Sequence, residues 1–291
     1  MNHYNSSEDI WDIEISPKTS LFFLNFSELW RYRDLLALFV KRDFSAKYKQ
    51  TILGPLWHFI QPLLTTIVSF VLFNVVANIG TNGQNRILFQ MSGIIIWNYF
   101  SACLTATSTT FVTNARLFGK VYFPRMISPL SIVMSNLVQL GIQFILLVLA
   151  MLYFVIGGQQ IYFGWSWILV PMFVFLLAVL ALGIGIIISS FTTKYRDLSV
   201  LVTFGIQLLM FASAVNYPIS ELSSRLGSNN IFYSFVKYNP LTWLIDGFRN
   251  ALLGGSINWV GVGYSAMVAF ILLFAGVLLF NKVEKTFMDT V

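Results

Sequence analysis

Charge and cysteine are scarce in this sequence. Charged residues make up 10% of its 291 residues, whereas soluble domains carry about 25%. The single cysteine, Cys103, excludes a disulfide within the chain. The sequence also lacks a glycine-rich phosphate loop followed by Lys and Ser or Thr, a helical pair of zinc-binding histidines and paired carboxylates. We therefore expect no catalytic, metal-binding or cofactor-binding residue in this chain.

Carboxylates are missing from a long central region. No Asp or Glu lies between Gln50 and Arg196. A carrier driven by protons or sodium ions usually needs a carboxylate inside the membrane, so this absence argues against such a carrier. No internal repeat is visible either, which argues against inverted-repeat carriers. If the chain transports a solute, we expect the energy to come from another subunit.

Long hydrophobic runs dominate what is present. Hydrophobic residues make up 57% of the chain, and several runs exceed the roughly 20 residues that a helix needs to cross a bilayer. Because the runs are continuously apolar rather than alternating, they predict helices and not the strands of a barrel. The sequence thus predicts an all-α integral membrane protein with six transmembrane helices. These are expected at about 53–78, 88–112, 127–156, 165–191, 198–216 and 258–280.

The expected organisation is a cytoplasmic polar tail at 1–26, an amphipathic interfacial helix at 27–50, a transmembrane domain at 51–281 and a second cytoplasmic tail at 282–291. Within the transmembrane domain, 113–126 is a basic and aromatic loop. The segment 217–257 is too polar to cross fully but contains short helices. The last of them is predicted to be re-entrant or interfacial, with Asn239 as its cap, Pro240 in its first turn and Gly254 at its end.

The basic residues predict the orientation. With both termini in the cytoplasm, 14 of the 18 Lys and Arg residues fall on the inner side. The other 4 are Arg86, Arg225, Lys237 and Arg249. This bias follows the positive-inside rule. Arg249 is spaced to pair with Asp246 at i,i+3.

The loop 113–126 is a candidate docking surface for a cytoplasmic partner. Its basic residues are also explained by the positive-inside rule alone, but its interleaved apolar groups suit a short helix that presents anchors to a partner's groove. The short basic turn after the fourth span is a second candidate contact. The predicted contact residues are Arg116, Leu117, Phe118, Lys120, Tyr122, Phe123 and Arg125 in the loop, with Lys194 and Arg196 in the turn.

The second span carries a polar stripe. Asn98, Ser101, Thr105 and Ser108 recur at steps of three and four residues. They can form hydrogen bonds between helices, or they can line a hydrated path. Ala181, Gly185 and Ser189 in the fourth span form a face of small residues, which predicts close helix packing.

Several motifs together resemble one family. A basic amphipathic helix precedes Tyr48-Lys-Gln-Thr-Ile-Leu-Gly-Pro-Leu-Trp57, and Pro62 follows in the first span. Lys194-Tyr-Arg-Asp-Leu198 and the pair Asn239-Pro-Leu-Thr242 and Asp246-Gly-Phe-Arg249 lie further along. Over about 27–285 the chain resembles the transmembrane subunits of polysaccharide ABC exporters of the ABC-2 type, which export O-antigen, capsule or teichoic acid in bacteria.

The resemblance implies which partners the chain has and which route its substrate takes. Two copies of the chain would form a channel in the bacterial inner membrane with two copies of a separate cytoplasmic ATPase, which would hold the ATP and Mg²⁺. A lipid-linked glycan would be the substrate, and nucleic acid would not be a partner. Entry would involve Lys47, Lys49, Leu53, Gly54 and Trp57. The channel or external gate would involve Trp97, Asn98, Tyr99, Tyr217, Asn239, Asp246 and Arg249.

Two other functions fit the same topology. An ABC-2 exporter of drugs or of another small amphiphile would need no change in the number of spans. A membrane enzyme acting on polyprenyl-linked sugars would need acidic or metal-binding residues at the membrane face, and these are scarce. The expected function is therefore the permease of an ATP-driven exporter of lipid-linked polysaccharide, with the drug exporter as the alternative.

Overall fold

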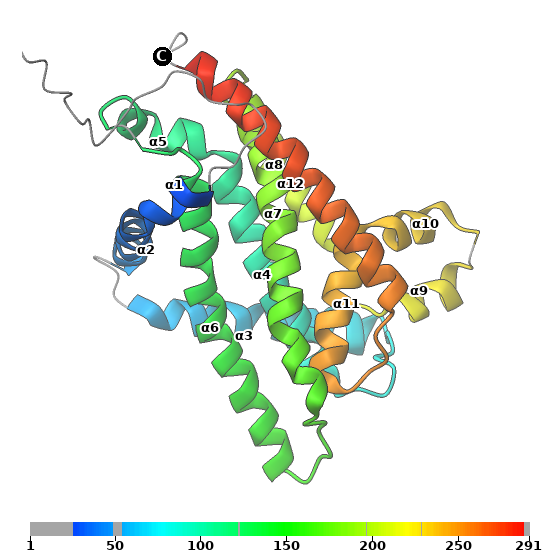
Figure 1. The fold of residues 1–291 in the computed structure, drawn as a ribbon. Coiled ribbons are helices and arrows are strands. Elements are labelled where there is room, and N and C mark those ends of the chain that lie inside the picture. Colours follow the sequence, from blue (N-terminus) through cyan, green and yellow to red (C-terminus); the bar gives the residue numbers. More distant parts are fainter. Residues whose placement is uncertain (1–25, 49–53, 122, 196, 228, 288–291) are drawn as a thin grey trace, which may run out of the picture.

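The structure is a computed structural model that describes residues 26–48, 54–121, 123–195, 197–227 and 229–287 (Figure 1). Every regular element within these ranges is a helix, so the all-α prediction is confirmed for them. Five helices are long and apolar enough to cross a membrane within the same part of the chain. They are Trp57–Val76 (α3 with the π-helix η2), Arg86–Ser108 (α4), Ile127–Ile156 (α6), Trp165–Thr192 (η3 with α7) and Trp259–Lys282 within α12.

Helix α7 (Val170–Thr192) lies at the centre of the packing. It makes its most extensive contacts with α12 (Trp259–Phe287) and with α4. A Cβ added at Gly183 would lie 2.6 Å from the backbone nitrogen of Leu273 in α12. A Cβ added at Gly185 would lie 2.7 Å from Cβ of Thr107 in α4. The small residues of the fourth predicted span therefore serve close packing, as expected.

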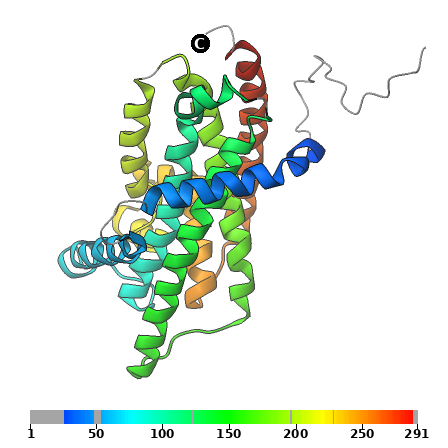
Figure 2. The same cartoon turned by 90° about the vertical axis from the view of Figure 1, so that its left-hand side faces the viewer.

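Two helices run across the long ones instead of along them. Helix α2 (Arg33–Tyr48), which follows the short α1 (Phe26–Arg31), is seen side-on in Figure 2 and packs against α6. The first predicted span, α3 with η2, also lies across the long helices in both views (Figures 1 and 2). It packs on α4 and α6 but leaves apolar residues such as Ile67 and Val68 more than half exposed. Another apolar surface must cover that side.

The fifth predicted span differs from the expectation. Helix α8 (Leu198–Phe211) has 14 residues, which is too short to cross a bilayer unaided. The chain then leaves the helix, and 212–217 forms a buried turn in which Ala214 has a positive φ of 51°. The predicted span had extended to 216, across Ser213 and into Asn216 of the turn.

Three short helices separate this turn from α12. They are α9 (Ile219–Leu226), α10 (Ile231–Tyr238) and α11 (Pro240–Leu253). The predicted ends of α11 are confirmed, because Asn239 Oδ1 accepts a bond of 3.0 Å from the Leu241 amide and Gly254 is left-handed with φ +81°. Helix α12 continues to Phe287, so residues assigned to the second tail belong to the helix.

The packing on α7 leads to a prediction for Gly183→Ala. The added methyl group would meet the α12 backbone, which cannot turn aside as a side chain can, so we expect destabilisation by about 1–3 kcal/mol. Gly141→Ala is the matched control, because nothing lies within 4 Å of a Cβ at this helical glycine. Thermal unfolding of the detergent-purified variants measures both effects. Equal midpoints for the two variants would contradict the close contact between α7 and α12.

Candidate transport and docking surfaces

A cluster of aromatic rings packs the predicted docking loop against the helices around it. A short helix, α5 (Thr110–Phe118), leads into the loop and includes its first residues, at the same end of the molecule as the last turns of α12 (Figure 1). The ring centroids are 4.5 Å apart for Phe111 and Phe280 of α12, and 5.6 Å apart for Phe118 and Phe123. Phe123 also meets Phe39 of α2 edge-on at 5.6 Å. The loop is thus packed against α2 and α12 at once.

This packing corrects the prediction that aromatic anchors face a partner. Phe118 and Phe123 are 3% and 5% exposed, so they stabilise the loop and cannot enter another protein's groove in this conformation. Arg125 is also buried, with its guanidinium 5.6 Å from the Phe118 ring centroid. Leu117 is half-buried against the core.

The exposed side of the loop carries basic groups. Arg116 and Lys120 are exposed, and Val121, which follows Lys120 in the chain, is 55% exposed. Lys194, in the turn after α7, is exposed beside Tyr195, with its Nζ 5.3 Å from the ring centroid. We call Arg116, Lys120, Val121 and Lys194 the docking surface. The predicted contacts Tyr122 and Arg196 lie outside the described residues.

The predicted entry stretch is only partly described. Lys49 and Leu53 lie outside the described residues, and Lys47 belongs to the last turn of α2. Gly54 begins the short helix η1 (Gly54–Leu56) with φ +49°, a left-handed conformation that favours glycine. Trp57 is 50% exposed at the start of α3. The positive φ marks a tight turn of the backbone at Gly54.

A hydroxyl groove lies between α4 and α8. Its cavity has a volume of about 430 Å³. Thr105, Ser108 and Thr109 line it from one side, and Ser199, Thr203 and Gln207 line it from the other. Part of the predicted stripe thus faces this cavity, whereas Asn98 and Ser101 are not among its lining residues. The α8 side was missed, although its polar residues recur every fourth position.

Two aromatic residues predicted for the channel lie in the core. Trp97 is 5% exposed and Tyr99 is 3% exposed. Helix α4 packs against α3, α6, α7, α8 and α11, so most of its circumference faces protein. These two rings therefore pack inside the chain in this conformation, and the prediction that they line a path is corrected.

Three of the predicted gate residues converge on the buried turn 212–217. The Asn239 amide donates to the Ala212 carbonyl and to Ser213 Oγ, both at 2.9 Å. Arg249, which is fully buried, donates to the carbonyls of Ala214 and Val215. Tyr217 donates its hydroxyl to the Phe211 carbonyl. Side chains thus replace the hydrogen bonds that the broken helix has lost.

Two amides outside the predicted set complete this arrangement. Gln90 Nε2 of α4 donates to the Asn216 carbonyl and to Asn74 Oδ1, both at 2.9 Å. Asn74 Nδ2 in turn donates to the Ile79 carbonyl at 3.0 Å. Both amides stand alone in apolar runs, which is the sequence signal that could have identified them, because a buried amide needs partners.

Asp246 and Arg249 do not form the expected ion pair. Asp246 accepts a bond of 3.0 Å from Asn250 Nδ2, while Arg249 turns to the backbone and lies 3.7 Å from the Phe89 ring centroid. Burial raises the pKa of the Asp246 carboxyl above its usual value, although the nearby Arg249 charge and the Asn250 bond oppose this effect. Asp246 therefore bonds within α11, whereas Arg249 bonds to the buried turn.

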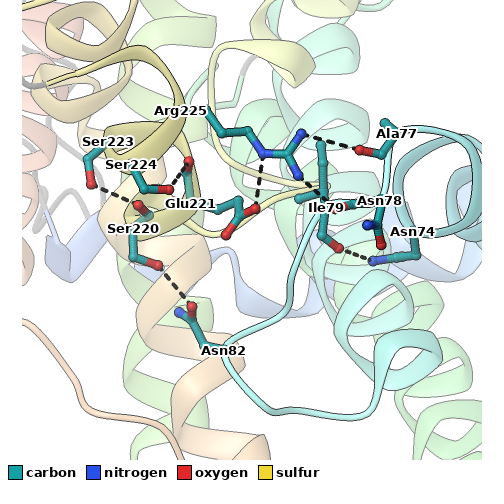
Figure 3. Close-up of polar contacts among 10 residues, drawn as sticks. All are labelled: Asn74, Ala77, Asn78, Ile79, Asn82, Ser220, Glu221, Ser223, Ser224 and Arg225. Carbon is teal, nitrogen blue, oxygen red and sulfur yellow. Dashed lines mark hydrogen bonds and ion pairs between the residues drawn. The ribbon is translucent and has the colours of Figure 1, made fainter.

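A clasp joins α9 to the end of the first long helix. Figure 3 shows Arg225 donating to the carbonyls of Ala77 and Asn78, at 3.3 and 2.7 Å, and to Glu221 Oε1 at 3.0 Å. Nearby, Ser220 Oγ donates to Asn82 Oδ1 at 2.9 Å. Arg225 therefore supplies donors to carbonyls beyond the end of η2 (Phe70–Val76). The i,i+4 spacing of Glu221 and Arg225 in the sequence could have identified this ion pair.

An amide cavity of about 740 Å³ opens beside this clasp. It lies between the loop before α4, the loop after α6, the first turn of α9 and the segment that joins α11 to α12. These loops lie at the end of the molecule away from α5 (Figure 1). Six side-chain amides, two aromatic rings and one carboxylate line it, namely Asn82, Gln84, Asn85, Gln160, Asn250, Asn258, Tyr162, Trp243 and Asp246.

Most of the chain is similar to known proteins. Residues 34–253 match the family described as ABC-2 type transporter. The O-antigen export system permease protein RfbA of Klebsiella pneumoniae is 27% identical over 257 residues, covering 88% of this chain and 94% of the relative. RfbA of Myxococcus xanthus is 30% identical over 223 residues, covering 76% and 81%. The polysialic acid transport protein KpsM of Escherichia coli is 22% identical over 264 residues, covering 87% and 95%.

The buried turn leads to a prediction for Arg249→Met. Methionine fills much of the same space but donates no hydrogen bond, so it leaves the carbonyls of Ala214 and Val215 without the Arg249 donor. Each such buried group costs about 1–3 kcal/mol. Arg249→Lys, which keeps the charge but loses the planar fork, is expected to be destabilised as well. Arg86→Met, at an exposed arginine of α4, is the control. If thermal unfolding shows no difference between Arg249→Met and Arg86→Met, Arg249 does not stabilise the turn.

Proposed function

The chain belongs to the ABC-2 type transporter family, and from this we propose that it is the channel-forming permease of an ATP-driven exporter of lipid-linked polysaccharide. The observation that carries the proposal is the similarity over 88% of the chain to a relative named for O-antigen export. The relative named for polysialic acid transport supports the same substrate class. Nothing comparable favours a drug as substrate.

A separate ATPase supplies the energy in this proposal. The chain has no nucleotide-binding motif and no acidic residue between Gln50 and Arg196. Two ATPase copies would bind ATP and Mg²⁺ and contact the docking surface from the cytoplasm. The basic groups of this surface would meet an acidic rim on the ATPase, and the exposed Val121 next to Lys120 would supply an apolar contact.

The aromatic cluster gives the docking loop a mechanical connection. Phe123 packs against Phe39 of α2, and Phe111 stacks on Phe280 of α12. Because packed rings cannot be compressed, a push on the loop displaces α2 and α12 together. Helix α2 leads directly to the entry stretch before α3, so ATPase movement would reach the site where the substrate enters.

A second copy of the chain completes the channel in this proposal. The apolar side of α8 is exposed at Val200, Leu201 and Phe204, by 72%, 62% and 60%. The hydroxyl groove lies beside this side, so a second copy facing it would enclose a path with polar lining. Helix α8 and the buried turn together would form the fifth of six spans, with both termini in the cytoplasm of a bacterial cell.

Deletion of the gene tests the substrate class. We expect the deletion strain to lose its surface polysaccharide and to accumulate lipid-linked polymer inside, and we expect the intact chain to restore export. The polymer is assembled on the cytoplasmic side, so loss of the permease should block its passage and not its synthesis. Immunoblots of surface and total polymer measure this. Normal surface polymer together with new drug sensitivity would instead establish the drug exporter.

The docking surface yields a prediction for the double variant Arg116→Glu, Lys120→Glu. We expect co-purification of the ATPase to fall about tenfold, which corresponds to about 1.4 kcal/mol of binding free energy. The thermal midpoint of the permease should stay unchanged, because both side chains are exposed. Phe118→Ala should lower that midpoint instead, since it opens a cavity among buried rings.

Arg86→Glu provides the matched control for the charge reversal. It lies at the other end of α4 and is also exposed. If the ATPase is recovered equally with the double variant and with this control, Arg116 and Lys120 do not contribute to docking.

A further inference from the structure

We propose that the amide cavity is a binding site for neutral sugar residues of the polymer, on the side where the polymer leaves the membrane. The inference rests on the proposed function, and it adds a specific contact site to the exit. It concerns the residues around Tyr162 and Asp246 and not the buried turn. The occupant is the sugar chain itself and not its lipid-linked phosphate end.

The chemistry of the lining distinguishes these two parts of the substrate. No lysine or arginine is among the described residues that line the cavity. A phosphate or pyrophosphate would need cationic donors there. Side-chain amides both donate and accept hydrogen bonds, as the hydroxyl groups of a sugar also do. The cavity volume of about 740 Å³ lies within the range usual for sites of small ligands.

The aromatic rings of the cavity lie directly against glycines, where a side chain would not fit. A Cβ at Gly254 would lie 2.5 Å from Cγ of Tyr162, and a Cβ at Gly164 would overlap the Tyr162 hydroxyl. A Cβ at Gly261 would lie 2.4 Å from Cδ2 of Trp243. Any larger residue at these glycines would displace the rings. The rings are therefore preorganised as flat apolar surfaces, which lowers the entropy cost of binding.

Several polar groups of the lining have bonding capacity left. Within the described chain, the Asp246 carboxylate accepts only from Asn250, through Oδ2. Asn82 uses its oxygen to accept from Ser220, and its amide nitrogen has no bond to another described residue. The Gln160 side chain makes none within the same ranges and is exposed. These three groups offer two acceptors and two donors to a ligand, so the site can bind several sugar hydroxyls at once.

Cysteine protection tests the proposal with the native polymer. Ser256→Cys places a thiol in the cavity lining, and Cys103 is fully buried and so gives no background. A membrane-impermeant maleimide is added to cells in which polymer synthesis is on or off. We expect labelling of Ser256→Cys to be several-fold slower with synthesis on. Ser224→Cys, on the exposed side of α9, should be labelled equally in both states.

A ring variant separates binding from mere passage of the polymer. Tyr162→Ala should abolish the protection of Ser256→Cys, whereas Tyr162→Phe should keep it, because the flat ring is retained. Tyr153→Ala, at a 73% exposed ring of α6 outside the cavity, should have no effect. Should Tyr162→Ala fail to fold, Gln160→Ala replaces it, since this exposed side chain makes no internal bond. If Ser256→Cys stays protected in both Tyr162→Ala and Gln160→Ala, the polymer passes the cavity without binding in it, and the proposal is wrong.

The outcomes separate this inference from the proposed function. Equal labelling of Ser256→Cys with synthesis on and off, in cells that export polymer normally, overturns the sugar site and leaves the export function intact. If the deletion strain displays normal surface polymer, the export function itself fails, whatever the labelling shows.

Oligosaccharides released from the surface polymer by mild acid provide a direct probe of the cavity. Added to cells without synthesis, they should also slow the labelling of Ser256→Cys.

Discussion

A peptide carbonyl buried among apolar helices must find a donor, and the structure depends on this constraint at the buried turn 212–217. A continuous helix would satisfy these carbonyls within itself, but α8 ends after 14 residues. Donors from α4 and α11 replace the missing bonds, through Gln90 and Arg249. A guanidinium without exposure is expensive to desolvate, and the cost is offset here because the carbonyls of Ala214 and Val215 and the Phe89 ring face the same cation.

The two ends of the molecule solve different problems with different residues. At the end that carries α5, apolar rings pack the loop against its neighbours while Arg116 and Lys120 stay exposed. At the other end, amides and glycines hold aromatic rings and leave polar groups accessible. Rigid packing suits the transmission of force, since closely packed rings move as one body. Fixed rings beside amides with spare bonding capacity suit transient contact with a polymer that must also dissociate.

The sequence predicted elements more successfully than it predicted the direction of their side chains. The helix ends at Asn239 and Gly254 and the close packing at Gly185 follow from local rules, and the structure confirms them. Local spacing could not show that Phe118 points into the chain, because its neighbours Phe111 and Phe123 are themselves packed against Phe280 and Phe39, which come from distant segments. Hydropathy missed the end of α8 for a related reason. The local sequence does not show that distant side chains satisfy the carbonyls of 212–217, which is what allows α8 to end in buried surroundings.

Helix α11 connects the two parts of the far end, because its opposite sides perform separate tasks. Trp243, Asp246 and Asn250 are spaced by three and four residues and line the amide cavity. Ile245, Phe248 and Arg249 lie on the buried side, and the last of these holds the turn after α8. A rotation of α11 would therefore change the cavity and the turn together. Since α8 also forms one wall of the hydroxyl groove, a sugar bound in the cavity would be coupled through this short helix to the groove.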